Sequence, residues 1–269
     1  MSIALLPDRG VVRVAGPDRT SFLQGLVSND VTAGLPAWSA LLTPQGKWLH
    51  EFFVLADGDS LLLETEAARA EELALRLRKF RLRAKVELAA EPGWQVAAGW
   101  GGAAVPPGGW PDPRLAEAGW RLCATSPIAA TSDAAAYDLH RLALGLPDGA
   151  RDLDIEKSIL LENGFDELHG IAWSKGCFMG QELTARTRYR GLVKKRLLPV
   201  AISGPAPPRD AVLLQDQAEA GTMRSSRDGR GLAVIRLEAL ERGVPITWEQ
   251  SGLTPHVPGW MQLPQPKAA

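Results

Sequence analysis

The stretch SKGCFMGQELTARTRYRG, residues 174–191, is the most informative segment for the fold, and it holds one of the chain's two cysteines. Gly176 and Gly180 bracket Cys177 closely, and glycines of this kind permit a tight, exposed turn. From Gln181 onward the stretch predicts a helix, which would place the thiol just before the positive end of a helix dipole.

Two properties of the stretch favour a functional thiol at its centre. A helix N-terminus and nearby cations stabilise a thiolate, and Lys175, Arg186 and Arg188 supply such cations. His169, which lies upstream, is a weaker candidate as the base of a Cys/His nucleophile. The alternative is a buried structural cysteine beside a solvated basic face, because free cysteines are often buried.

The charge of the chain is unevenly distributed. Its formal net charge is −1, but residues 175–196 contain seven Lys or Arg and one acid. A local positive patch on an otherwise mildly acidic chain predicts an anionic ligand or an acidic partner. An RNA-binding module that uses residues 186–196 stays open as an alternative, although Tyr189 is the only aromatic residue there that could stack on a base.

Composition excludes several classes of protein. The chain has 269 residues, of which 45% are hydrophobic and 23% charged, values typical of a soluble globular protein. Two cysteines and four histidines without metal-ligand spacing exclude a disulfide framework and a four-cysteine cluster held by one copy. No apolar run approaches the ~20 residues that span a bilayer, and MSIALLPDRG at the start lacks the features of a signal peptide. We therefore expect a cytoplasmic protein with free thiols and no membrane partner.

Local patterns in the first 90 residues predict short strands and helices. Thr65 can cap a helix, and Pro44-Gln45-Gly46 predicts a hairpin turn. Apolar and charged residues alternate in 80–88, which is typical of a half-exposed strand. The order of elements predicts an α+β fold rather than a parallel doubly wound sheet. The expected strands lie at 11–14, 39–42, 48–55, 61–63 and 80–88, with helices after Asp18 and at 66–77.

The remainder of the chain predicts a further helix and a small barrel. Ser132 or Asp133 can cap a helix that ends at about Gly145. The segment 204–208, GPAPP, is typical of an interdomain linker. Short strands separated by turns follow in 211–248, which predicts a small β-barrel. The Pro-rich tail from Pro255 is expected to be loosely ordered.

The octapeptide KGCFMGQE, residues 175–182, resembles the K-G-C-[aromatic]-x-G-Q-E motif of the YgfZ family. That family lies in the superfamily of the glycine-cleavage aminomethyltransferase (GcvT). The continuation of the stretch resembles the mitochondrial branch, which helps to assemble [4Fe–4S] proteins. FLQG at 22–25, NDV at 29–31 and LTPQGK at 42–47 resemble further motifs of the family, and the resemblance extends to about residue 240.

The resemblance implies an α+β fold of two mixed α/β antiparallel-sheet modules and a C-terminal small β-barrel. These parts would surround a central opening that binds a folate in relatives. The expected boundaries are a folate-binding-type region at 1–203, with interleaved modules at 1–45 with 130–203 and at 46–129, a barrel at 204–254 and a flexible tail at 255–269.

The resemblance also implies a non-enzymatic factor for the assembly or repair of iron–sulfur clusters. Cys177 would be a thiolate ligand or reactive thiol that shares iron or a [2Fe–2S] cluster with a partner, because one chain supplies too few ligands. The implied partners are an A-type iron–sulfur carrier and [4Fe–4S] client enzymes, with nucleic acid less favoured. The implied functional residues are Cys177, Lys175, Gly176, Gly180, Gln181, Glu182 and Arg186.

A folate pocket for tetrahydrofolate is implied as well, with Gln24, Asn29, Asp30, Glu51 and Arg141 as its residues. Aminomethyltransferases place an acidic pair after the hairpin, where this chain has His50-Glu51. They also hold the pterin with a glutamate, where this chain has Ala143, and alanine offers no acceptor to the pterin N–H groups. These departures predict that aminomethyl transfer is lost. A tetrahydrofolate-dependent one-carbon enzyme stays the alternative function.

Overall fold

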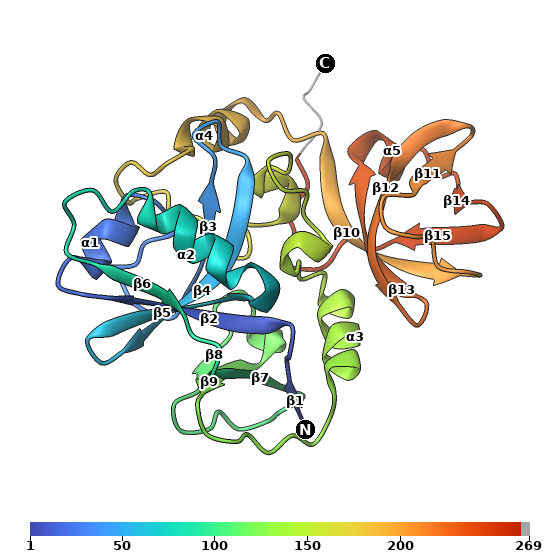
Figure 1. Ribbon diagram of the computed structural model, residues 1–269. Coiled ribbons are helices and arrows are strands. Elements are labelled where there is room, and N and C mark those ends of the chain that lie inside the picture. The colour runs from blue at the N-terminus through green and yellow to red at the C-terminus, as the bar shows by residue number, and fades with distance from the viewer. Residues whose placement is uncertain (265–269) are drawn as a thin grey trace.

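The structure, a computed structural model, describes residues 1–264 of the chain. It contains two antiparallel sheets and a closed barrel (Figure 1). In Figure 1 the sheets lie on one side of the molecule and the barrel on the other, with helix α3 (Ala134–Leu144) between them. This architecture confirms the α+β class with a C-terminal barrel.

The larger sheet has the strand order β3-β4-β5-β2-β6. Helix α2 (Ala70–Arg78) packs against it through Leu73 and Leu77, which are fully buried in one core with Val12 and Leu63 of the sheet. The apolar face of α2 therefore covers this sheet. The other elements are β2 (Arg9–Ala15), α1 (Arg19–Gln24), β3 (Ala37–Leu42), β4 (Trp48–Asp57), β5 (Ser60–Glu66), the 3-10 helix η1 (Ala67–Arg69) and β6 (Glu87–Ala90).

The smaller sheet has the order β1-β7-β9-β8. Its first strand, which the sequence patterns did not predict, pairs with a strand far along the chain, as Ser2 lies opposite Trp100. The predicted helix α3 is confirmed at both ends, since the Asp133 side chain accepts from Ala136 N and Gly145 has a left-handed φ of 76°. The sheet consists of β1 (Ser2–Leu5), β7 (Gln95–Trp100), β8 (Trp110–Pro111) and β9 (Trp120–Ala124), with the 3-10 helix η2 (Ala116–Ala118) before β9.

Six strands close the barrel in the order β10-β13-β12-β11-β14-β15. Leu198, Met223 and Ile235 are fully buried inside it. The barrel is therefore a packed core. Its elements are β10 (Lys195–Ser203), β11 (Val212–Gln215), β12 (Ala218–Arg227), β13 (Arg230–Arg236), α5 (Leu237–Glu241), β14 (Ile246–Trp248) and β15 (Ser251–Pro255).

The sheets do not respect the boundaries expected from the sequence. β10 pairs with β13 and β15, so the barrel begins before residue 204. The segment 204–208 is a loop of the barrel, and it is not an interdomain linker. β3 pairs with β4 across the boundary expected at 45/46. Gly and Pro mark a turn, but they do not show whether the chain on either side belongs to one sheet.

Two further local predictions are wrong. Residues 80–86 form no strand, and Leu82 is 89% exposed with a φ of 43°, because alternation alone cannot supply a partner strand. The chain after Pro255 is packed rather than loose. Met261 is buried in the barrel core, and Trp260 Nε1 donates to Leu144 O at 2.8 Å. The last part of the expected tail, 265–269, lies outside the described residues.

The segment between α3 and the barrel returns to the larger sheet and carries the cysteine. It contains the 3-10 helices η3 (Gly149–Arg151) and η4 (Leu160–Asn163), followed by helix α4 (Gln181–Arg190). The start of α4 lies against the hairpin between β3 and β4, where Gly180 approaches Gly46 (Figure 1). The fold thus brings two segments that the sequence predicted separately, the hairpin and the cysteine stretch, into contact.

Candidate functional site

Only one of the two thiols lies at the surface. Cys177 is exposed, whereas Cys123 of β9 is buried. Burial raises the pKa of the Cys123 thiol far above its usual range, so that thiol stays protonated and inert. Cys177 precedes Gly180, the N-cap residue of α4. Its exposure excludes the alternative of a buried structural cysteine.

The neighbouring Lys175 is buried, and its ammonium is held by backbone carbonyls. Lys175 Nζ donates hydrogen bonds of 2.7 Å to Val27 O and of 2.7 Å to Asn29 O. Burial lowers the pKa of Lys175 to about 8. A buried ammonium must find acceptors, and the two carbonyls supply them. The expected role of Lys175 as stabiliser of the Cys177 thiolate is therefore not supported, and it anchors the loop instead.

Two backbone hydrogen bonds hold the cysteine loop on either side of the thiol. Ala172 N donates to Ser28 O at 3.1 Å, and Met179 N donates to Gly25 O at 3.2 Å. Together with the Lys175 ammonium, these bonds fasten the loop to the turn that follows α1. The position of Cys177 is consequently fixed from both directions along the chain.

The two glycines of the motif have different roles. Gly180 has a φ of 80°, and a Cβ at this position would lie 2.5 Å from Thr43 O and 2.9 Å from the Gly46 Cα. A Cβ at Gly176 would meet nothing within 4 Å. Gly180 therefore lets the motif close against the β3–β4 hairpin, while Gly176 lies in the open beside the thiol.

Of the other motif residues, some hold the loop in place and others are exposed beside the thiol. Phe178 is buried in the core, and its backbone N–H donates to the Gln181 side chain at 3.4 Å. Glu182 is exposed on the first turn of α4. Most of the motif thus builds the loop, and Cys177 is left at the surface with Gly176 and Glu182.

The basic side chains of α4 do not converge on the thiol. The Arg188 guanidinium lies 4.1 Å from the centre of the Trp173 ring, and its Nε lies 3.6 Å from the Asp166 carboxylate. Arg186 is exposed and forms no ion pair within residues 1–264. The expected thiolate stabilisation by these arginines has no direct contact to support it, and neither does a base at His169.

An open hollow of about 500 Å³ lies beside Cys177. Within residues 1–264, no three His, Cys, Asp or Glu side chains are placed to hold a metal ion. Iron bound through Cys177 would thus need ligands from another molecule. The hollow is lined by Pro17, Thr20, Ser21, Gln24, Gly25, Thr32, Gly176 and Cys177.

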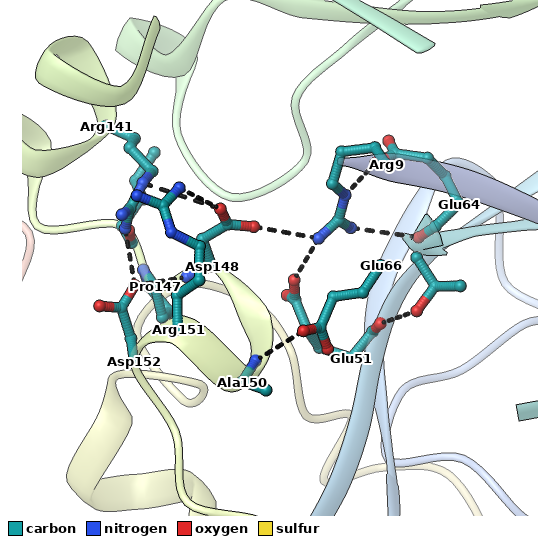
Figure 2. Close-up of polar contacts among 12 residues, drawn as sticks. Arg9, Glu51, Glu64, Glu66, Arg141, Pro147, Asp148, Ala150, Arg151 and Asp152 are labelled. Atoms are coloured by element: carbon teal, nitrogen blue, oxygen red, sulfur yellow. Dashed lines mark hydrogen bonds and ion pairs between the residues drawn. The ribbon is translucent and has the colours of Figure 1, made fainter. Parts of the chain in front are cut away.

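A separate cavity of about 270 Å³, called the central cavity below, is lined by both sheets and α3. A buried ion-pair network forms much of its wall (Figure 2). Arg9 lies at the centre of the network. Its Nη1 donates to Glu51 at 2.9 Å and to Asp148 at 3.1 Å, and its Nε donates to Glu64 at 2.7 Å. The Arg9 guanidinium therefore joins three acidic side chains from different parts of the chain.

Most other charged side chains of this cavity are paired as well. Arg121 forms two hydrogen bonds to Glu64, of 2.5 and 2.6 Å. Burial by itself would raise the pKa of Glu64, but Arg121 and Arg9 outweigh it and lower the pKa. Arg141 donates to Asp138 at 2.7 Å and to an Asp152 oxygen at 2.6 Å. The groups are held charged, and they neutralise one another.

The cavity residues do not fit a pterin. One Glu51 oxygen accepts from Arg9 and the other from the Trp38 indole N–H, so the carboxylate is already ion-paired and hydrogen-bonded without a ligand. Ala143 is exposed on α3 and does not line the cavity. The sequence did not indicate that Glu51 is already engaged, because its partner Arg9 lies on β2, which only the fold brings close to β4. We derive no chemistry through a folate.

The five residues expected to form the folate pocket also lie in different places. Glu51 and Arg141 line the central cavity, whereas Gln24 lines the hollow beside Cys177. Asn29 lines neither, and its side chain donates to Trp38 O and His169 O. Asp30 accepts from Gln24 and from the turn after it. The structure thus contains a thiol surface and a separate charged cavity.

The overall fold has a solved counterpart. The glycine cleavage system aminomethyltransferase T from Bartonella henselae matches with a TM-score of 0.73 at 14% identity, covering 97% of this chain and 86% of that one. This similarity shows the fold that was expected. A family profile described as the CAF17 C-terminal beta-barrel domain matches residues 194–263, which includes β10 in the barrel.

Sequence relatives carry a functional name. The human mitochondrial iron–sulfur cluster assembly factor IBA57 is 30% identical over 95% of this chain and 84% of its own length. A homolog from Mycosarcoma maydis is 34% identical over 77% of this chain, which spans 59% of the fungal protein. Both names describe assembly factors, in agreement with the iron–sulfur branch of the expected superfamily.

These names correct one expectation. The relatives are mitochondrial proteins, which contradicts the cytoplasmic location inferred from the sequence. No helix within residues 1–264 is long and apolar enough to cross a membrane. The thiol motif, the GcvT-type fold and the human relative lead to one conclusion: the chain belongs to the IBA57 family of iron–sulfur cluster assembly factors.

Proposed function

We propose that the chain acts without catalysing a reaction, by contributing Cys177 as one ligand to iron or a [2Fe–2S] cluster. An A-type iron–sulfur carrier holds the remaining ligands, and [4Fe–4S] enzymes are the clients that benefit. The cluster is cargo that passes through the complex rather than a resident cofactor of this chain.

The observation that supports the proposal most strongly is that the other motif residues hold the loop in place while Cys177 is exposed. Lys175, Phe178 and Gly180 are buried or closely packed and hold the loop in place. Cys177 is exposed at the edge of an open hollow. A cysteine with a purely structural role is usually buried, whereas here the surrounding contacts hold Cys177 at the surface.

The ligand inventory supports a shared site. Iron–sulfur clusters take four protein ligands, usually cysteine thiolates. This chain has two cysteines, and the second, Cys123, is buried and protonated. One accessible thiol per chain fits a cluster whose other ligands come from a partner. The open hollow leaves room for that partner to reach the sulfur.

The central cavity supports the absence of one-carbon chemistry. The glutamate that holds the pterin in aminomethyltransferases is replaced here by Ala143, which is exposed on α3, does not line the cavity and offers no side-chain acceptor. The Glu51 carboxylate is already ion-paired with Arg9. Isothermal titration with tetrahydrofolate checks this directly. We expect no heat of binding at millimolar ligand, and saturable binding in the cavity would restore the transferase alternative.

Anaerobic reconstitution tests the ligand role. The full chain is mixed with an A-type carrier, ferrous iron and sulfide, and visible absorption of the complex is recorded. We expect Cys177→Ala to lose the charge-transfer bands that the wild-type mixture shows. Cys123→Ala is the matched control, because its thiol is buried. Equal absorption from wild type and Cys177→Ala would reject the shared-ligand role.

A further inference from the structure

The exposed side of α4 carries features that the ligand role of Cys177 does not use. Residues three or four apart share one face of a helix, and Glu182, Arg186, Tyr189 and Arg190 are exposed on this side. Thr184 and Thr187 are buried on the opposite side. The helix is therefore anchored by small polar residues and presents a basic face with one aromatic ring.

Three cations at the end of this helix and just after it are free of ion pairs within residues 1–264. They are Arg186, Arg190 and Lys194, and all three are exposed. The two cations that directly follow Lys194 are paired. Lys195 lies 3.7 Å from Glu162, and Arg196 lies 2.6 Å from Glu167. Within the described residues, the positive segment seen in the sequence thus retains these three exposed, unpaired charges.

Apolar surface accompanies these charges. Tyr189 is 79% exposed and Leu192 is 46% exposed. A helix that is polar on all sides gains little stability from packing on its own protein. Tyrosine and arginine together are enriched at protein–protein interfaces. These side chains therefore form a surface suited to a second protein.

The same observations disfavour RNA as the occupant. Sequence-tolerant binding of single strands uses several aromatic rings as stacking platforms. Tyr189 is the only exposed aromatic residue of the run, and the nearby Trp173 is half-buried with the Arg188 guanidinium over one face of its ring. A single ring would leave most bases of a strand without a stacking partner.

We propose that the α4 face, defined as Arg186, Tyr189, Arg190, Leu192 and Lys194, docks an acidic surface of the protein that supplies the other cluster ligands. This inference rests on the proposed function and adds the place at which the partner binds. Charge complementarity selects an acidic partner and speeds its approach. A ten-residue helix is ~15 Å long, so a partner seated on α4 can reach the thiol that precedes the helix.

The test measures binding of an apo A-type carrier to the full chain by biolayer interferometry at several salt concentrations. The α4 variant is Arg186→Glu with Arg190→Glu. The matched control is Arg230→Glu with Arg242→Glu on the barrel, since both residues are exposed and the change in net charge is the same. We expect the α4 variant to bind at least about tenfold more weakly, with a flatter salt dependence, and the control to bind normally.

Circular dichroism checks that each variant is folded, and Arg186→Gln with Arg190→Gln provides a milder change that should weaken binding by an intermediate amount. Normal carrier binding by the α4 variant would overturn the docking surface, and so would equal losses in both charge-reversal variants. A 20-nucleotide single-stranded RNA is the second probe. RNA binding that is lost in the α4 variant while carrier binding persists would assign the face to RNA and overturn the proposal.

Cys177→Ala separates this inference from the function on which it rests. We expect Cys177→Ala to bind the apo carrier normally while losing the absorption of the shared cluster. If Cys177→Ala loses the cluster and the α4 variant binds normally, the docking surface is wrong and the ligand role stands. If Cys177→Ala keeps the cluster and the α4 variant loses the carrier, the ligand role is wrong and the docking surface stands.

Discussion

Replacing Gly180 by alanine perturbs the contact on which the cysteine loop depends. Gly180 has a left-handed φ of 80°, and the added Cβ would lie 2.5 Å from Thr43 O. That oxygen belongs to the backbone of the β3–β4 hairpin, so it cannot swing aside as a side chain could. The motif and the hairpin must separate for the methyl group to fit.

The expected cost has two parts. An alanine in the left-handed region loses about 1–2 kcal/mol relative to its preferred conformations. Forcing an extra carbon into a closely packed contact typically costs about 1–3 kcal/mol more. Gly180→Ala should therefore lower the free energy of unfolding by about 2–5 kcal/mol, and at about 2–4 °C per kcal/mol the melting temperature should fall by roughly 4–20 °C.

Gly176→Ala is the matched control within the same motif. Its φ is outside the left-handed region, and its Cβ would meet nothing within 4 Å. An open surface site of this kind should change stability by no more than about 0.5 kcal/mol. Urea unfolding followed by far-UV circular dichroism measures both variants. Similar midpoints for Gly176→Ala and Gly180→Ala would refute the different roles assigned to the two glycines.

Three other outcomes follow from the buried groups. Burial lowers the pKa of Lys175 from its ordinary 10.5 to about 8. Between pH 8 and 10.5 the unfolded chain therefore binds more protons than the folded chain, so Lys175 makes the free energy of unfolding rise with pH in this range. Lys175→Met should remove a rise of at most about 3 kcal/mol in urea melts between pH 8 and 10, and an unchanged slope would argue against the buried anchor. Glu64→Gln strips Arg9 and Arg121 of their shared carboxylate and should destabilise the fold by about 3–5 kcal/mol, while Glu64→Gln as stable as wild type would show the network to be dispensable. Ellman's reagent should titrate one thiol in the native protein and two in urea, whereas rapid native reaction of both would contradict the burial of Cys123.

Local chemistry made part of the fold predictable. α3 is capped by Asp133 and ends at Gly145 as expected, because a capping side chain and a left-handed glycine each act on residues only a few positions away in the chain. The β3–β4 hairpin follows from its turn residues for the same reason. The strand predicted at 80–88 is formed only from Glu87 onward, in β6, because alternation describes one strand and carries no information about where a neighbouring strand is available for pairing.

The site was predictable only in outline. The sequence indicated Cys177, which is exposed in the structure, and a basic run, of which Lys175 and Arg196 are buried and others are paired. It could not indicate that Lys175 reaches the carbonyl of Val27, since that contact depends on how the loop folds back onto a distant turn. The separation of Gln24 from the central cavity has the same origin. Long-range contacts of this kind depend on tertiary structure, and no local pattern encodes them.

The iron and acid-labile sulfide content of the complex with the carrier, isolated anaerobically by gel filtration, shows whether the cluster depends on Cys177. We expect wild type and Cys123→Ala to co-elute with the carrier and to carry equal amounts of iron and sulfide, while Cys177→Ala co-elutes without them. Wild-type amounts of iron and sulfide in the Cys177→Ala complex would rule out the shared ligand, because the cluster would then need no thiol from this chain.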